Sequence, residues 1–180
     1  MAEKKRTRDL KAAIRSVPDF PKKGIVFRDI TTLLADPEAT RDVADSIADR
    51  FRSRGIDVVA GIEARGFIFG ALVAERLGAA FVPVRKPGKL PYKTVRETYE
   101  LEYGTDAIEM HVDAIRRGQK VLVVDDLLAT GGTMAACCRL AEKLGGVVVG
   151  CACVIELSFL HGRGKLEGRE VFALVDYEAE

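Results

Sequence analysis

The 180-residue sequence contains no tryptophan, only two histidines and only four cysteines. The cysteines form two close pairs, Cys137 with Cys138 and Cys151 with Cys153, and neither pair has the C-x-x-C spacing of a redox centre or a zinc site. Their neighbours are apolar, which is typical of cysteines that fill a hydrophobic core. The two histidines are too far apart in sequence to indicate a metal cluster. We therefore expect neither a reactive thiol pair nor a dedicated set of metal ligands.

The sequence also lacks an excess of either charge, because 28 Lys and Arg stand against 27 Asp and Glu. No global basic surface is expected, which argues against nucleic acid and acidic membranes as partners. The longest apolar run in the second half, residues 147–155, is far shorter than the roughly 20 residues that a spanning helix needs. The basic residues near the N-terminus are not followed by the apolar segment of a secretory signal. These absences predict a cytoplasmic protein, in which any anion site is local.

Nearly half of the residues, 48%, are hydrophobic and 31% are charged, which predicts one globular domain with a sizeable core. Short apolar segments rich in branched and aromatic residues are typical of buried parallel strands, and they occur at residues 56–60, 79–84 and 121–124. Helical patterns follow the first and the last of these, over residues 67–77 and 133–144, and each ends at a glycine. The repeated strand-loop-helix order predicts an α/β fold with a mostly parallel sheet. Residues 147–155 and 171–175 would supply the last strands.

Two further helices are predicted near the N-terminus. Residues 37–54 begin after Asp36 as a capping residue, carry an apolar row at Val43, Ile47 and Phe51, and stop at Gly55. A shorter amphipathic helix is expected over residues 10–17. Apolar and polar residues alternate over residues 108–113, which predicts a half-exposed strand at an edge or in a flap.

The strongest functional pattern follows the strand at residues 121–124. Two carboxylates, Asp125 and Asp126, precede a turn of small residues that opens a helix, namely Ala129, Thr130, Gly131, Gly132 and Thr133. Glycines allow a tight turn, and the threonine hydroxyls lie beside free amides at the positive end of a helix, which predicts a phosphate site. The turn lacks the lysine of a P-loop and the glycine spacing of a dinucleotide site. Because carboxylates accept hydrogen bonds from vicinal hydroxyls, a ribose 5-phosphate suits this segment.

Cationic residues follow the two other strands. Arg65 lies in a turn that opens a helix, where a guanidinium and free amides would meet at an anion. The alternative is a surface arginine paired with Glu63. Arg85, Lys86 and Lys89 follow the strand at residues 79–84, and although such runs are often only solvated, this position favours anion binding.

The segment at residues 121–133 resembles the phosphoribosyl pyrophosphate (PRPP) motif of the type I phosphoribosyltransferases. Four other segments are similar to the adenine-using branch of that family and keep its order, at residues 21–30, 61–67, 85–91 and 99–104. The resemblance covers roughly residues 10–160. It implies a single domain with the type I phosphoribosyltransferase fold, a central mostly parallel sheet flanked by helices. It also implies an N-terminal arm and base-binding hood at about residues 1–35, and a flexible catalytic loop, or lid, at about residues 91–105.

The same resemblance implies roles for the phosphate-site residues. The turn of Ala129, Thr130, Gly131, Gly132 and Thr133 would bind the 5-phosphate, and Asp125 and Asp126 would bind the ribose. Pyrophosphate would be held by Arg65, Arg85, Lys86 and Lys89. Arg65, Asp125 and Asp126 would belong to the catalytic set.

Roles in base binding and in the lid are implied in the same way. Phe27 would stack on the base while backbone groups near Val26 and Arg28 read its edge, although on pattern alone Phe27 is a buried staple before a helix. Glu102 would be the catalytic acid and base, and Tyr103 would lie in the lid. Without the resemblance, Glu102 is a solvated loop residue.

The implied reaction is transfer of the 5-phosphoribosyl group from PRPP to adenine, which gives AMP and pyrophosphate in purine salvage. Magnesium would be held mainly by the substrate, with no dedicated cluster of protein ligands, and the protein would be a homodimer. Three alternatives remain open. They are the same reaction on hypoxanthine, guanine or xanthine, a noncatalytic regulator that binds PRPP, and a magnesium-dependent phosphatase with Asp125 as nucleophile.

Overall fold

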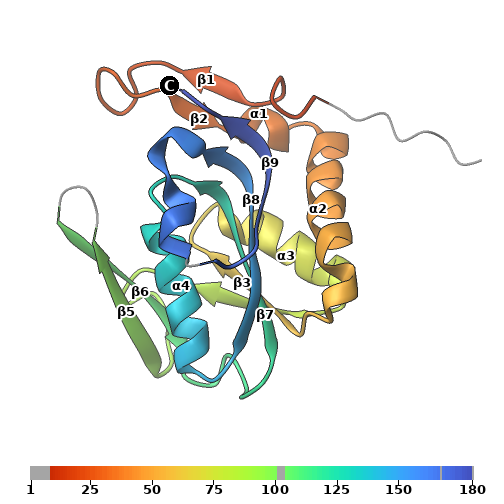
Figure 1. Ribbon diagram of the computed structural model, residues 1–180, viewed down its shortest axis with the longest axis vertical. Coiled ribbons are helices and arrows are strands. Elements are labelled where there is room, and N and C mark those ends of the chain that lie inside the picture. The colour runs from red at the N-terminus through yellow and green to blue at the C-terminus, as the bar shows by residue number, and fades with distance from the viewer. Residues whose placement is uncertain (1–8, 101–103, 167, 180) are drawn as a thin grey trace, which may run out of the picture.

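The structure is a computed structural model that describes residues 9–100, 104–166 and 168–179 (Figure 1). At its centre is a five-stranded sheet in the order β4-β3-β7-β8-β9, in which every neighbouring pair is parallel. The five strands are β3 (Val58–Ile62), β4 (Ala80–Val84), β7 (Lys120–Leu128), β8 (Val147–Leu157) and β9 (Val171–Tyr177). The predicted α/β fold with a mostly parallel central sheet is therefore confirmed.

Helices cover both faces of this sheet, and the side chains of β7 show how the core divides. Val121 and Val123 pack in one cluster with residues of α4 (Gly132–Lys143). Leu122 and Val124 point to the other face and pack with α2 (Pro37–Phe51) and α3 (Gly66–Leu77). Because successive side chains of a strand alternate between faces, a strand buried on both sides is apolar at every position. This explains the uninterrupted apolar run in the sequence.

Helix α2 begins where its sequence predicts and ends at Phe51, three residues before the predicted end at Arg54. The Asp36 carboxylate accepts hydrogen bonds from the backbone amides of Glu38 (2.9 Å) and Ala39 (3.1 Å), which satisfies donors that a helix start leaves free. A 3-10 turn, η1 (Arg52–Arg54), follows the helix, and Gly55 then takes a left-handed conformation with φ of 66°. The short helix α1 (Thr31–Leu34) precedes α2. None of the described helices is long and apolar enough to cross a membrane.

The helix predicted over residues 10–17 is wrong. Residues 10–13 make a single turn, and the chain then forms β1 (Arg15–Val17), which pairs antiparallel with β2 (Phe27–Asp29). Strand pairing satisfies the backbone of this segment, while Ile14 is buried in the core at 6% exposure. Tertiary pairing thus overrides the helical spacing of the apolar residues. The hairpin lies where the hood was expected, and residues 1–8 of the expected arm lie outside the described residues.

A second hairpin, β5 (Thr94–Glu100) with β6 (Thr105–His111), projects beside α4 (Figure 1). Strand β6 agrees with the alternation seen in the sequence, and its Ile108 and Met110 are buried. Residues 94–100, which the sequence predicts as part of a loop at residues 91–105, instead form strand β5. Seven residue pairs with β6 hold this strand, although its sequence is polar. Residues 101–103 lie outside the described residues. The lid residues Glu102 and Tyr103 are among them.

All four cysteines are buried and free, as expected of core residues. Cys137 and Cys138 lie on α4, and Cys151 and Cys153 lie on β8. The sulfur atoms of Cys138 and Cys151 are 3.5 Å apart across the interface between helix and sheet. Burial raises the pKa of Cys137 and of Cys153. A thiol held in its protonated form in the core packs as a small apolar group.

Candidate active site

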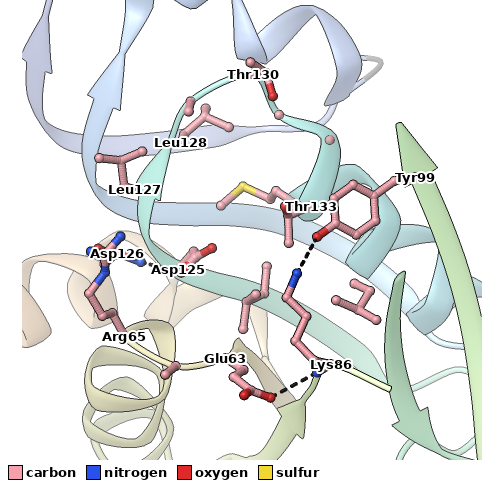
Figure 2. Close-up of a pocket in the computed structure, with 17 residues that line it drawn as sticks. Glu63, Arg65, Lys86, Tyr99, Asp125, Asp126, Leu127, Leu128, Thr130 and Thr133 are labelled. Carbon is pink, nitrogen blue, oxygen red and sulfur yellow. Dashed lines mark hydrogen bonds and ion pairs between the residues drawn. The ribbon is translucent and has the colours of Figure 1, made fainter. Parts of the chain in front are cut away.

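A cavity of about 490 Å³ opens at the carboxyl ends of β3, β4 and β7 (Figure 2). Its walls come from the segment that follows β3, from Lys86 after β4, and from the end of β7 with the first turn of α4. Tyr99 and Ile108 of the β5–β6 hairpin close one side. In a parallel sheet the loops that leave neighbouring strands converge, which is why residues far apart in sequence meet here.

Asp125 and Asp126 lie at the centre of one wall. The amide of Asp126 donates a hydrogen bond to Asp125 Oδ1 (2.8 Å), and the Asp126 side chain is only 6% exposed. Burial and the charge of Asp126 raise the pKa of Asp125 well above its ordinary value, and burial also raises the pKa of Asp126. Two adjacent carboxyl groups with raised pKa values in a cavity are typical of a functional site.

Arg65 stands beside this pair at the start of α3, with its Nε 2.6 Å from Asp126 Oδ2 (Figure 2). The alternative pairing of Arg65 with Glu63 does not occur, since Glu63 binds the cations after β4 instead. The next residue, Gly66, lies so close to β7 that a Cβ on it would be 2.8 Å from Asp125 Oδ1. A glycine here lets α3 approach the carboxylate pair, so the segment places a guanidinium and a helix start on one cavity wall.

The predicted phosphate turn lines the opposite part of the cavity, and all five of its residues, Ala129, Thr130, Gly131, Gly132 and Thr133, contribute. Gly131 is left-handed, with φ of 78°, and α4 starts immediately after it. The first amides of a helix have no carbonyl partner within that helix, so these N–H groups and the dipole of α4 favour an anion at this end. The structure therefore brings the turn, Asp125, Asp126, Arg65 and Lys86 to one cavity.

Glu63 organises the cationic residues that follow β4. Its Oε2 accepts hydrogen bonds from Arg85 Nε (3.1 Å) and from the amide of Lys86 (3.0 Å), and its Oε1 accepts from Lys89 Nζ. Burial raises the pKa of Glu63, but the bonds from Lys89, Lys86 and Arg85 outweigh it, so this pKa lies below its ordinary value. Among the described residues Arg85 and Lys89 are not part of the cavity wall, although Lys86 is.

Lys86 connects the cationic loop to the β5–β6 hairpin. Its Nζ donates to the Tyr99 hydroxyl (3.3 Å; Figure 2). It also donates to the Asp106 carboxylate. The hydrogen bond from Lys86 lowers the pKa of Asp106. No role was assigned to Tyr99, Asp106 or Glu63 from the sequence, because none of these residues belongs to a sequence motif typical of a binding site. Strand alternation could have placed Tyr99 inward, but only the hairpin register reveals its partner.

The three candidate base-binding residues, Val26, Phe27 and Arg28, are not among the described residues that line this cavity. Phe27 lies beside it, because its ring centre is 5.3 Å from the Arg65 guanidinium and 5.2 Å from the ring of Phe20. The side chain of Arg28 is directed elsewhere and stacks on Tyr177. Strand β2 therefore reaches the cavity through the contact of Phe27 with Arg65.

In the parts of the chain that the structure describes, no group of three or more His, Cys, Asp or Glu residues is arranged to hold a metal ion. The carboxylates on the cavity wall are Glu63, Asp125 and Asp126. Glu63 is engaged by cations, which leaves the aspartate pair as the hard oxygen ligands that face the cavity.

Comparison with known proteins agrees with the fold. The family described as "Phosphoribosyl transferase domain" matches residues 29–173. The chain therefore belongs to the phosphoribosyltransferases. It is 61% identical over 169 residues to the adenine phosphoribosyltransferase of Clostridium perfringens, which covers 94% of this chain and 98% of that relative.

Solved structures point to the same branch. The crystal structure of adenine phosphoribosyltransferase from Thermoanaerobacter pseudethanolicus superposes with a TM-score of 0.91 at 52% identity, over 93% of this chain and 98% of that one. The Saccharomyces cerevisiae enzyme superposes with a TM-score of 0.87 at 41% identity, over 92% and 96%. Within the phosphoribosyltransferases, the chain belongs to the adenine phosphoribosyltransferase family.

Proposed function

We propose that this protein transfers the 5-phosphoribosyl group of PRPP to adenine, which yields AMP and pyrophosphate. The observation that carries the proposal is the meeting of four features in one cavity: the phosphate turn, the aspartate pair, Arg65 and Lys86. A ribose with phosphate at both ends needs two anion sites separated by acceptors for its hydroxyls. Adenine is supported as the base by the names of the relatives, and the yeast structure was solved with an imino-altritol bisphosphate and adenine.

The cavity suggests how PRPP lies. The 5-phosphate binds the turn at residues 129–133 and the ribose hydroxyls face Asp125 and Asp126. The pyrophosphate then extends toward Arg65 and Lys86. Arg85 and Lys89, which we also propose for pyrophosphate, are bound to Glu63, so they reach the leaving group only if the phosphates exchange with that carboxylate.

In the reaction, the bond from the anomeric carbon to the pyrophosphate oxygen breaks and a bond to a ring nitrogen of adenine forms. The electron pair leaves with pyrophosphate, and the purine loses a proton. Positive charge develops on the sugar, beside the carboxyl groups of Asp125 and Asp126. Arg65 and Lys86 stabilise the negative charge on the leaving group. Preorganised charges and alignment of this kind are each worth several kcal/mol.

For the base we propose stacking on Phe27, with backbone groups near Val26 and Arg28 at its edge. Phe27 is half-buried and lies 5.3 Å from the Arg65 guanidinium, so a base beside this ring is close to the pyrophosphate end of the cavity. Glu102 as the acid and base, and Tyr103 as a lid residue, stay predictions, since both lie outside the described residues.

Magnesium fits this site as an ion that arrives with the substrate. The Asp125 and Asp126 oxygens face the cavity, and Mg²⁺ typically uses one or two carboxylates together with substrate phosphates. When bound, it neutralises charge on the pyrophosphate. We also propose a homodimer in the cytoplasm, and light scattering of the purified protein tests the dimer.

A steady-state assay tests the function. PRPP and magnesium are supplied with adenine, hypoxanthine, guanine or xanthine in separate reactions, and nucleotide and pyrophosphate are measured. We expect AMP from adenine, with strong preference over the other bases. Turnover of another base would overturn the base assignment, and PRPP binding without turnover would point to a regulator. A phosphoenzyme trapped on Asp125 would point to the phosphatase.

A further inference from the structure

The C-terminal strand β9 ends against the N-terminal hairpin β1–β2 (Figure 1). The guanidinium of Arg28, on β2, lies 3.9 Å from the centre of the Tyr177 ring, at the end of β9. The ammonium of Lys11 lies 4.5 Å from the same ring. Arg28 and Tyr177 are each only 8% exposed. Two cations therefore share one aromatic ring at the junction between hood and sheet.

Arg28 depends on this ring for much of its stabilisation. Its Nη1 donates to Ser16 Oγ (2.6 Å) on the paired strand, but its buried Nε has no hydrogen-bond partner in the described part of the chain. A buried cation that lacks a full set of hydrogen bonds destabilises the folded protein unless a nearby group with negative charge density compensates for it. An aromatic face supplies such compensation, and the interaction strengthens when both groups are shielded from water.

The position of Tyr177 is fixed by its strand, which is part of the central sheet. Strand β9 is parallel to β8, with Tyr177 opposite Leu157 in the register. The Tyr177 carbonyl accepts a hydrogen bond from Ser158 Oγ (3.3 Å), and the carbonyl of Asp176 accepts one from Lys11 Nζ (2.7 Å). Among the described strands, β1 and β2 pair with each other and with no strand of the five-stranded sheet, so the hairpin lacks this anchorage.

Strand geometry connects this junction to the site. Arg28 is next to Phe27 on β2, and successive side chains of a strand point to opposite faces. Arg28 is directed to Tyr177, whereas the Phe27 ring is directed toward Arg65 at the cavity. A shift of Arg28 therefore moves the backbone that carries Phe27.

We propose that Tyr177 is a positioning residue for the base site, which holds Arg28 and thereby fixes Phe27 and the adjoining backbone where adenine binds. The proposal rests on the proposed function. It assigns β9 a role in base binding and none in PRPP binding, since the aspartate pair lies on β7 and the phosphate turn leads into α4.

The test replaces the ring and measures the two substrates separately. Tyr177→Leu should raise the KM for adenine roughly fivefold to tenfold, the effect of losing a shielded cation–π contact, while the KM for PRPP changes less than about twofold. Tyr177→Phe keeps the ring and should restore the wild-type adenine KM. Phe172→Leu is the matched control, because Phe172 lies on the same strand but faces Arg50 of α2, with 5.9 Å between guanidinium and ring centre.

A second variant and a second measurement distinguish the proposed effect from general misfolding of Tyr177→Leu. Arg28→Met removes the cation, keeps an unbranched side chain, and should raise the adenine KM as Tyr177→Leu does. In Tyr177→Leu, the amide hydrogens of residues 15–29 should exchange faster than in the wild type, while the exchange rates in α4 stay unchanged. An unchanged adenine KM, an equal rise for both substrates, or the same rise in Phe172→Leu would overturn the proposal. A wild-type protein that makes no AMP would instead overturn the function, and hydrogen exchange would still report on the junction.

Discussion

Gly131 and Gly162 meet backbone to backbone, so closely that neither can carry a side chain. A Cβ on Gly131 would collide with the carbonyl oxygen of Gly162, and a Cβ on Gly162 would collide with that of Ala129. Gly162 begins the 3-10 helix η3 (Gly162–Leu166), which thus supports the phosphate turn from outside the cavity. Arg163 fixes this helix through two hydrogen bonds of 2.6 Å to the buried Glu156 carboxylate. The shape of the turn therefore depends on a segment about 30 residues further along the chain.

Gly162→Ala should distort the phosphate turn. The backbone must shift to accommodate the new Cβ, which lowers the free energy of unfolding by about 1–3 kcal/mol and Tm by roughly 5 °C in a domain of this size. We expect the KM for PRPP to rise about tenfold, because the amides of the turn no longer converge on the phosphate. Steady-state kinetics and thermal unfolding measure both effects. Gly164→Ala in the same helix is the control, since a Cβ there meets open space; equal losses in the two variants would contradict the interpretation.

Asp125→Asn and Asp126→Asn should each lower kcat/KM by about a hundredfold, the loss typical when one preorganised electrostatic group is removed. The amide keeps the size of the side chain and removes the ionisable carboxyl group that lines the cavity. Asp113→Asn is the matched control, because Asp113 is exposed and is not among the described residues that line the cavity. Wild-type kcat/KM in both variants would overturn the assignment of the pair.

Asp125→Asn should at the same time stabilise the fold at neutral pH. The raised pKa of Asp125 means that from about pH 4 upward the unfolded chain loses this proton before the folded protein does, so stability falls as pH rises. Asparagine has no such dependence and still accepts the hydrogen bond from the Asp126 amide. The Tm of the variant should exceed that of the wild type at pH 7, and the difference should vanish toward pH 4. A lower Tm at pH 7 would contradict the raised pKa.

Glu63→Gln should show the opposite pH dependence. The pKa of Glu63 is lowered in the folded protein, so its stabilisation is present above about pH 4.5 and disappears as pH falls through the folded pKa. At pH 7 we expect a loss of about 1–2 kcal/mol, since Arg85 and Lys89 are partly exposed and screened by solvent. Urea unfolding at pH 7 and pH 4 measures it. Glu75→Gln is the control, because that side chain is 79% exposed; equal losses would show that Glu63 has no special role.

The four thiols should be unreactive in the native protein. All are buried in the core between α4 and β8, so an aromatic disulfide reagent can reach them only after unfolding. We expect no rapid release of thiolate from the native protein and about four equivalents after denaturation in guanidinium. Fast reaction of one thiol without denaturant would show that this core opens locally.

Much of this protein follows from its sequence alone. The apolar runs at residues 58–62 and 121–124 determine strands buried on both faces, because no polar residue in them allows a solvated side. Asp36 determines where α2 begins, through capping hydrogen bonds, and the left-handed Gly55 ends the 3-10 turn that follows the helix. The small-residue turn after Asp126 predicts an anion site, since the helix start that follows it presents free amides. These features depend on neighbours in the chain, so sequence reasoning reaches them.

Other features depend on contacts between distant segments, which only the tertiary structure decided. Residues 15–17 carry a helical pattern but form a strand, because β2 supplies their hydrogen-bond partners. Glu63 binds the cations after β4 rather than Arg65, because the parallel register of β3 and β4 places them side by side. Tyr177 meets Arg28 because strand β9 ends against the β1–β2 hairpin. Such pairings follow from where the elements pack, and no local pattern in the sequence encodes them.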